Sequence, residues 1–129
     1  MTCEILKTSK KICVLGISNR PDRDSGRIAL FLKDKGYSVT GVHPSINEYE
    51  GIKVYQRLQD VPHDIDILDV FISSDKIPGI IDEVLEINPK VVWLQLGIRN
   101  DEAVKPLIEK GITVIQDECI AIHYRMCNH

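Results

Sequence analysis

The feature that most constrains the fold is an alternation of short apolar runs with segments of helical periodicity. Five apolar runs of strand length lie at residues 12–15, 37–42, 65–72, 91–96 and 112–115. Apolar residues at helical spacing follow at 28–32, 77–85 and 104–108, and Asp117-Glu118 opens a short terminal helix. Strands separated by helices form parallel sheets with right-handed crossovers. We therefore predict an α/β three-layer fold around a five-stranded parallel sheet.

The order of the five strands follows from one missing crossover helix. Residues 45–62 are predicted to form a loop with one helical turn around Tyr55–Gln59, so no helix joins the second and third strands. The predicted order is 3-2-1-4-5, which leaves strand 65–72 at an edge. Asp69 lies in this strand, and burying an unpaired carboxylate is energetically unfavourable. We therefore expect that Asp69 is solvated at the edge or that it has a partner. The order reverses between strands one and four, where such sheets bind ligands.

Composition excludes several classes of protein. The 129 residues show no linker or repeat, so a single domain over residues 1–129 is expected. A net charge of −3 without a basic block gives no sign of a nucleic-acid surface. The longest apolar runs are too short to span a membrane, and the first residues lack the apolar core of a secretory signal. These features favour a cytoplasmic protein.

The cysteines do not form the framework of a small secreted disulfide protein. There are four, at Cys3, Cys13, Cys119 and Cys127. Cys119, His123 and Cys127 are spaced by four, with His129 beyond, a pattern that zinc could use. Four ligands on one terminal helix cannot all converge, so we predict no metal. Cys119 is expected to be a small buried hydrophobe, and the C-terminal residues are expected to be frayed.

The first strand ends in a candidate phosphate site. Its apolar run stops at Gly16, and a polar loop leads to a helix with Asp24 or Ser25 as N-cap. A helix N-terminus after a glycine turn presents N–H groups to phosphate, and Arg23 lies in the same loop. An ordinary connection without a ligand explains the stretch equally well.

The pattern does not match an NAD site. Gly16-Ile-Ser-Asn-Arg-Pro has one glycine where such sites have GxGxxG, and Val42-His43-Pro44 stands where an acidic residue would hold the ribose. The predicted crevice would be lined from residues 16–25 and 95–97. His43-Pro44 and Ser73-Ser74 lie on neighbouring loops of the same rim.

Several blocks of the chain resemble the small stand-alone CoA-binding proteins, single-domain relatives of the nucleotide-binding domain in the succinyl-CoA synthetase α subunit. The blocks are Val-Leu-Gly-Ile-Ser-Asn-Arg-Pro-Asp-Arg-Asp-Ser (14–25), Gly-Tyr-Ser-Val (36–39), Val-His-Pro (42–44), Asp-Ile-Leu-Asp-Val-Phe (66–71), Val-Val-Trp-Leu-Gln-Leu-Gly-Ile (91–98) and Asp-Glu-Cys (117–119). The resemblance implies a Rossmann-like fold that binds CoA across the loops of strands one and four. By that likeness Gly16, Ile17 and Ser18 meet the phosphates, Arg23 stands where the family often has a basic residue, and Pro44 and Ser73 border the adenosine.

The chain also departs from the family pattern. Ile17 lies where the family usually has Ala, and His43 lies where the family usually has Asn before the proline. Ile72-Ser73-Ser74 replaces a segment that often begins with Arg. The last two departures lie on the predicted rim, so they bear on ligand affinity and identity.

No catalytic constellation is visible. His43 reads as a loop histidine, Ser18 has no identifiable His and Asp partners, and Gln95 fits core hydrogen bonding as well as ligand contact. We predict a CoA or acyl-CoA binding protein without chemistry of its own. The expected CoA-binding residues are Gly16, Ile17, Ser18, Arg23, Ser25, His43, Pro44, Ser73, Gln95 and Gly97.

Other hypotheses remain open. One is a subunit of an acyl-CoA synthetase-like enzyme, whose separately encoded partner would supply the phosphoryl-histidine chemistry and nucleotide hydrolysis. Others are an NAD(P)-binding domain and a domain kept only for protein contacts, including contacts within a homo-oligomer.

Overall fold

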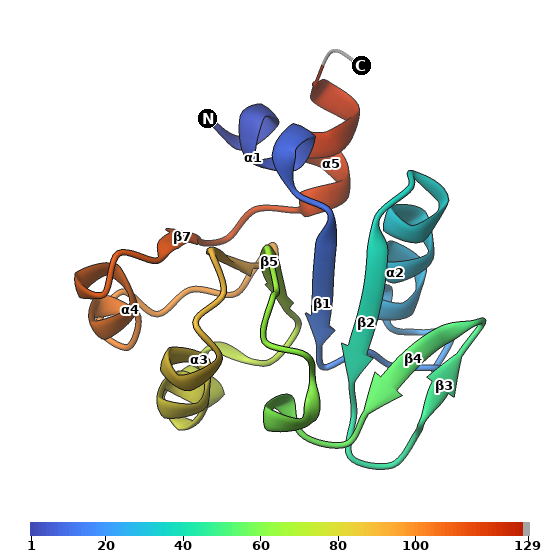
Figure 1. Ribbon diagram of the computed structural model, residues 1–129, viewed down its shortest axis with the longest axis horizontal. Coiled ribbons are helices and arrows are strands. Elements are labelled where there is room, and N and C mark those ends of the chain that lie inside the picture. The colour runs from blue at the N-terminus through green and yellow to red at the C-terminus, as the bar shows by residue number, and fades with distance from the viewer. Residues whose placement is uncertain (128–129) are drawn as a thin grey trace.

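The computed structural model describes residues 1–127 and places a sheet between two layers of helices (Figure 1). Within that range the sheet has seven strands in the order β3-β4-β2-β1-β5-β6-β7. The strands are β1 (Lys11–Leu15), β2 (Ser38–Val42), β3 (Glu48–Tyr49), β4 (Ile52–Tyr55), β5 (Ile67–Val70), β6 (Val91–Leu94) and β7 (Thr113–Ile115). All neighbours are parallel except β3 and β4. The Rossmann-like α/β class is confirmed.

The predicted five-stranded order 3-2-1-4-5 is wrong. Residues 45–62 contain the β3–β4 hairpin, whose two-residue turn at Glu50-Gly51 has positive φ at both positions (49° and 84°). Ile52 and Val54 are buried while Lys53 is exposed, a strand alternation that is too short to stand out in sequence. Strand β5, predicted at an edge, lies between β1 and β6. The order therefore reverses between β1 and β5.

The helices cover both faces of the sheet (Figure 1). They are α1 (Thr2–Thr8), α2 (Asp24–Asp34), α3 (Ile81–Ile87), α4 (Lys105–Glu109) and α5 (Ile120–Met126), with 3-10 turns at Leu58–Asp60 and Ser74–Ile80. Leu68 and Val92 pack on the same side as α3 and α4. Ile67 and Trp93 pack with α1, α2 and α5 on the other side. Strands buried on both faces account for the continuous apolar runs in the sequence.

Three helix boundaries differ from, or refine, the sequence prediction. Helix α2 begins at Asp24 with Arg23 at the N-cap, so neither Asp24 nor Ser25 caps it. The helix predicted from residue 77 is a 3-10 segment up to Ile80, because Pro78 cannot donate a backbone hydrogen bond. Helix α4 starts late, at Lys105, with Pro106 in its first turn, where a missing N–H costs no helical hydrogen bond.

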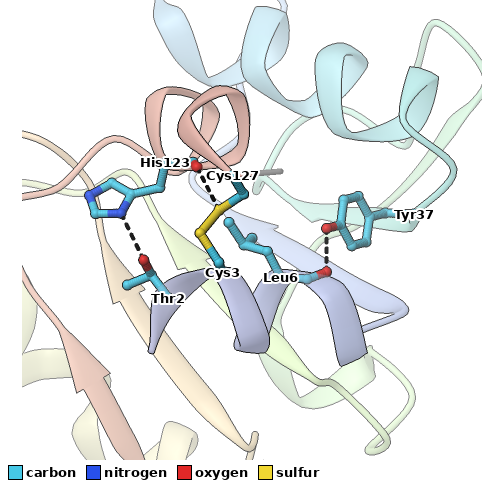
Figure 2. The surroundings of a disulfide bond; sticks show 6 residues. All are labelled: Thr2, Cys3, Leu6, Tyr37, His123 and Cys127. Carbon is cyan, nitrogen blue, oxygen red and sulfur yellow. Dashed lines mark hydrogen bonds between the residues drawn. A yellow bond between two sulfur atoms is a disulfide. The ribbon is translucent and has the colours of Figure 1, made fainter. Parts of the chain in front are cut away.

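The two ends of the described chain are held together by a disulfide between Cys3 and Cys127 (Figure 2). It joins α1, which the sequence analysis did not predict, to the end of α5. Leu6 of α1 is buried, and its carbonyl accepts a hydrogen bond from the Tyr37 hydroxyl at 2.5 Å. The expectation that the C-terminal residues fray is therefore wrong for Cys127. Sequence spacing missed the bond because residues 124 positions apart meet only in the fold.

Because of the disulfide, Cys119, His123 and Cys127 cannot act together as zinc ligands. Cys127 Sγ is bonded to Cys3. The ring nitrogens of His123 contact Thr2 Oγ1 at 3.1 Å and Glu118 Oε2 at 2.9 Å. Within residues 1–127 no three His, Cys, Asp or Glu side chains are grouped as metal ligands. His129 lies outside the described residues.

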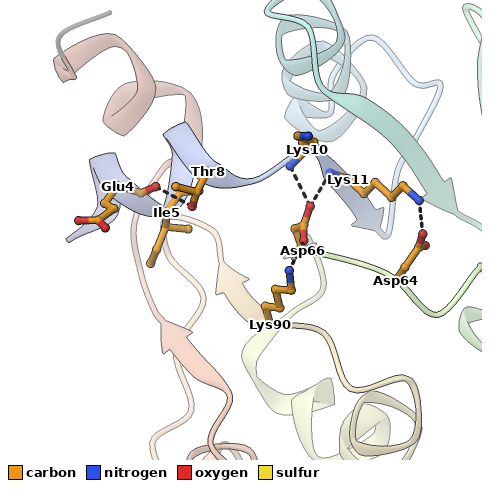
Figure 3. A network of polar contacts seen from close by, with 8 residues as sticks. All are labelled: Glu4, Ile5, Thr8, Lys10, Lys11, Asp64, Asp66 and Lys90. Carbon is orange, nitrogen blue, oxygen red and sulfur yellow. Dashed lines mark hydrogen bonds and ion pairs between the residues drawn. The ribbon is translucent and has the colours of Figure 1, made fainter.

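Asp66 fastens the start of β1 to the segment before β5 (Figure 3). Its Oδ2 accepts the backbone N–H groups of Lys10 at 2.8 Å and Lys11 at 2.9 Å. Its Oδ1 lies 3.2 Å from Lys90 Nζ. Partial burial raises the pKa of Asp66, but these hydrogen bonds and the lysine charge outweigh it, and the pKa is lowered overall.

A buried acid lies at the centre of the sheet. Asp69 on β5 is fully buried between Val14 of β1 and Trp93 of β6, so it is not the solvated edge residue that the sequence suggested. Its Oδ1 accepts a hydrogen bond from Gln95 Nε2 at 2.5 Å. Its Oδ2 has no partner among residues 1–127. Burial raises the pKa of Asp69 to about 8, against the hydrogen bond from Gln95, which lowers it.

The disulfide should contribute substantially to stability. The disulfide closes a loop of 124 residues. By the chain-entropy model, replacing both cysteines with serine should lower the free energy of unfolding by about 4–5 kcal/mol. Urea unfolding of Cys3→Ser/Cys127→Ser should show this loss. Cys119→Ser, which breaks no covalent bond, should cost much less. Equal losses in the two variants would show that the disulfide does not stabilise the fold.

Asp69 should make stability fall as pH rises. Its pKa is raised from an ordinary 3.8 to about 8, so its contribution is fully present below about pH 4 and is lost as the pH rises through about 8. Asp69→Asn imitates the protonated acid. We expect the free energy of unfolding of Asp69→Asn, relative to that of the native protein, to rise by up to about 1.4 kcal/mol per pH unit below pH 8. Thermal unfolding of both proteins from about pH 5 to about pH 9 measures this difference.

Asp66→Asn is the control for this experiment. Because the pKa of Asp66 is lowered, Asp66 stays ionised over the same pH range whether folded or not. The stability difference between Asp66→Asn and the native protein should therefore be constant. A constant difference for Asp69→Asn as well would contradict the buried protonated acid.

Candidate functional site

A cavity of about 620 Å³ opens at the edge where the parallel strands end. Its walls come from the loops after β2, β1, β5 and β6, from the start of α2, and from the segment before α5. The lining residues are Gly16, Ser18, Arg20, Asp22, Arg23, Asp24, Ser25, Ile28, His43, Phe71, Ile72, Ser73, Gln95, Leu96, Ile98 and Cys119. The carboxyl end of a doubly wound sheet is where this class of fold binds ligands.

Seven of the ten residues expected at the site line this cavity. They are Gly16, Ser18, Arg23, Ser25, His43, Ser73 and Gln95. The side chain of Ile17 instead fills the core against Gly41, and Ile17 is fully buried. Pro44 is exposed beside the rim. Gly97 turns the chain with φ of 86°, and its N–H donates to Asp117 Oδ1 at 2.6 Å.

Two glycines let backbone segments approach closely beneath the cavity. Gly16 has φ of 90°, and a Cβ there would lie 2.6 Å from the carbonyl oxygen of Phe71. Gly26, in the first turn of α2, would place a Cβ 2.5 Å from the carbonyl oxygen of Ser18. The first and third glycines of dinucleotide turns have the same two uses, a tight turn and close helix packing. The larger spacing here hid this correspondence from motif reading.

The N-terminus of α2 faces the cavity with unused donors. No side chain caps the helix, so its first N–H groups are not satisfied by a cap. Ser25 is only 3% exposed, lines the cavity, and has no side-chain hydrogen-bond partner within residues 1–127. The hydroxyl of a nearly buried residue at a helix N-terminus, left without a partner and open to a cavity, suits an anionic ligand.

The charges around this helix start leave one cation uncompensated. Arg20 pairs with Asp22 at 3.5 Å, and Arg27 pairs with Asp24 at 2.5 Å. Arg23 lines the cavity without an ion-pair partner among the described residues. The helix dipole and Arg23 therefore both favour negative charge in the cavity.

The polar groups on the other walls are held in place by local contacts. His43 Nδ1 accepts the Ser45 N–H at 3.0 Å, which leaves Nε2 for other partners. Ser18 Oγ accepts the Arg20 N–H at 3.1 Å. Gln95 is 3% exposed, and its amide group donates to Asp69 beneath it. No hydrogen bond links His43 to Ser18 within the described chain, so the structure gives neither residue a base–nucleophile pairing.

Sequence reasoning missed the apolar wall of the cavity and Cys119. Phe71 and Ile72 follow β5, which the wrong strand order had moved to the edge. Leu96 and Ile98 extend the wall beyond β6. Cys119 was read as a core residue, yet it is partly exposed and lines the cavity. A signal was available for Phe71 and Ile72, since they directly follow a strand, but none located Cys119.

None of the helices in residues 1–127 is long and apolar enough to cross a membrane.

Comparison with known proteins agrees with this geometry. Residues 10–125 match the model of the CoA binding domain family. The uncharacterised protein YneT of Bacillus subtilis is 44% identical over 119 residues, which cover 92% of this chain and 88% of YneT.

Two solved structures share the fold. A hypothetical protein from Pyrococcus horikoshii has a TM-score of 0.89 at 31% identity, covering 96% of this chain and 87% of that one. A protein from Thermus thermophilus also has a TM-score of 0.89, at 36% identity, covering 96% and 95%. With the family match extending over nearly the whole chain, this protein belongs to the family of CoA-binding domains.

Proposed function

We propose that the cavity binds CoA or an acyl-CoA, with the pyrophosphate against the loop after Gly16 and the N-terminus of α2. The observation that carries the proposal is the unpartnered, nearly buried Ser25 at that helix start, next to the unpaired Arg23. Phosphate binding uses such a combination of helix N–H groups, a hydroxyl and a cation. The family match to a CoA binding domain supports the choice of ligand.

The rest of the cavity suits the two ends of CoA. His43 follows β2, the side that holds the adenosine in dinucleotide-binding folds. No acidic residue follows β2 there to hold a ribose diol, which argues against NAD. On the opposite side, Phe71, Ile72 and Leu96 offer apolar surface to the pantetheine arm. In this proposal Ser18, Ser73 and Gln95 complete the lining, Ile17 and Gly97 support the loops, and Pro44 borders the rim.

We further propose that the protein is a cytoplasmic binding module without chemistry of its own. Among the lining residues that the structure describes, the cavity presents no paired nucleophile and base. In the cytoplasm most disulfides are reduced. The redox state of Cys3 and Cys127 in cell extracts, read by differential thiol labelling, therefore tests the proposed location.

CoA should bind more tightly than other nucleotides. Calorimetry with CoA, dephospho-CoA, ATP and NAD should rank CoA first, because of the four only CoA combines three phosphate groups with a pantetheine arm that the cavity wall can cover. Tighter binding of NAD than of CoA would overturn the proposed function. Native mass spectrometry of the purified protein gives an independent measurement, since retained CoA would appear as a bound mass.

Arg23 should contribute to affinity through its charge. Charge-assisted hydrogen bonds contribute about 1.5–3 kcal/mol, and an exposed arginine should lie at or below the low end. We expect Arg23→Ala to raise the Kd for CoA by up to about tenfold, with a smaller effect at high salt. Arg57→Ala is the matched control, because Arg57 pairs with Asp60 at 3.3 Å outside the cavity lining. Equal losses in both variants would show that Arg23 makes no specific contact.

A further inference from the structure

Cys119 is the accessible free thiol of the chain, and it lies inside the cavity. Cys3 and Cys127 are bonded to each other. Cys13 is completely buried, and burial raises the pKa of its thiol to about 12, so it is neither reachable nor ionised. Cys119 is partly exposed and is part of the cavity lining. A reagent that enters the cavity therefore meets one thiol.

Contacts to β6 hold Cys119 in this position. Trp93 Nε1 donates to the carbonyl oxygen of Glu118 at 2.9 Å. The N–H of Glu118 donates to the carbonyl oxygen of Leu94 at 3.4 Å. The residue before Cys119 is thus tied to both a buried tryptophan and the end of β6. Cys119 is placed by the sheet and not by a free loop.

Strand order puts Cys119 at the end of the cavity opposite His43. The neighbouring strands lie in the order β2-β1-β5-β6. His43 follows β2, the phosphate-facing loop follows β1, and Gln95 and Leu96 follow β6. Neighbouring strands lie about 4.8 Å apart, so the loop after β1 is roughly 10 Å from the end of β6. With phosphate at Ser25 and adenosine towards His43, the remaining arm of CoA extends towards Cys119. That arm ends in a thiol.

We propose that Cys119 is a modification site that forms a mixed disulfide with CoA, and this inference rests on the proposed CoA-binding function. The co-reactant is CoA disulfide, the oxidised dimer of the ligand. The Cys119 thiolate attacks one sulfur of CoA disulfide, and a bond forms between Cys119 Sγ and that sulfur. The old sulfur–sulfur bond breaks, and the second CoA leaves as a thiolate that takes up a proton.

The exchange needs no further oxidant, and the site can accommodate it. One half of CoA disulfide occupies the cavity, while the leaving half extends past Leu96, which is 66% exposed at the rim. A small thiol reverses the reaction, as it does for other reversible thiol caps. Ser25 supplies the independent indication of a ligand, since this nearly buried hydroxyl is open to the same cavity without a partner.

The test compares two disulfides that carry the same arm. CoA disulfide carries the nucleotide, whereas pantethine lacks the adenosine and the phosphates. After incubation of the full chain with each reagent, intact mass gives the rate, and peptide mapping gives the modified cysteine. We expect one CoA per chain, on Cys119, formed about ten times faster than the pantethine adduct. Cys119→Ser should form no adduct.

The ratio of the two rates separates directed from random modification. Arg23→Ala should lower the ratio of CoA disulfide rate to pantethine rate by up to about tenfold, as it weakens the phosphate contact. Arg57→Ala should leave the ratio unchanged. An adduct mainly on Cys3 or Cys127, or equal rates for the two reagents, would overturn the inference.

Calorimetry distinguishes the failure of the inference from the failure of the proposed function. If the native protein binds CoA but CoA disulfide leaves Cys119 unmodified, the modification site is wrong and the binding function stands. If CoA does not bind at all, both are wrong.

Discussion

The close approach of three backbone segments beneath the cavity is the constraint on which the site depends. Gly16 brings the end of β1 against the carbonyl of Phe71, and Gly26 brings the start of α2 against the carbonyl of Ser18. Any Cβ at either position would push the segments apart. Because the helix start is fixed in this way, its unsatisfied N–H groups and Ser25 are presented to the cavity with little freedom. Such preorganisation reduces the entropy lost when a flexible ligand binds.

Local patterns in the sequence located the central elements of the sheet but not their order. The runs that became β1, β2, β5, β6 and β7 are apolar because both faces of those strands are buried, and this signal is local. The hairpin around Glu50-Gly51 was missed because its strands are short and only half apolar. Strand order depends on long-range pairing. The wrong order came from the missing crossover helix. Of the two alternatives left open for Asp69, an edge position and a partner, the structure has the partner, because a raised pKa and the hydrogen bond from Gln95 let this acid lie in the centre.

Much of the candidate site was nevertheless predictable, because the end-of-strand rule does not need the strand order. All parallel strands end at one edge, so Gly16, His43, Ser73 and Gln95 come together in any order of those strands. Phe71 and Ile72 were left out because the predicted strand extended to residue 72, whereas β5 ends at Val70. The position of Cys119 in the cavity could not be predicted from the sequence, because it depends on the hydrogen bond between Trp93 and Glu118, which are 25 residues apart. The side chain of Ile17 lies in the core, a direction that family likeness alone does not give.

The Asp69–Gln95 pair connects the core of the sheet to the electrostatics of the cavity. Gln95 lines the cavity and donates to Asp69, so an ionised Asp69 would put a negative charge directly beneath a ligand with several phosphates. Charges in a poorly solvated interior are weakly screened, and that repulsion would oppose binding. With its pKa raised to about 8, Asp69 is mostly protonated at pH 7. The burial that makes this acid costly to ionise is therefore also what keeps the floor of the cavity neutral.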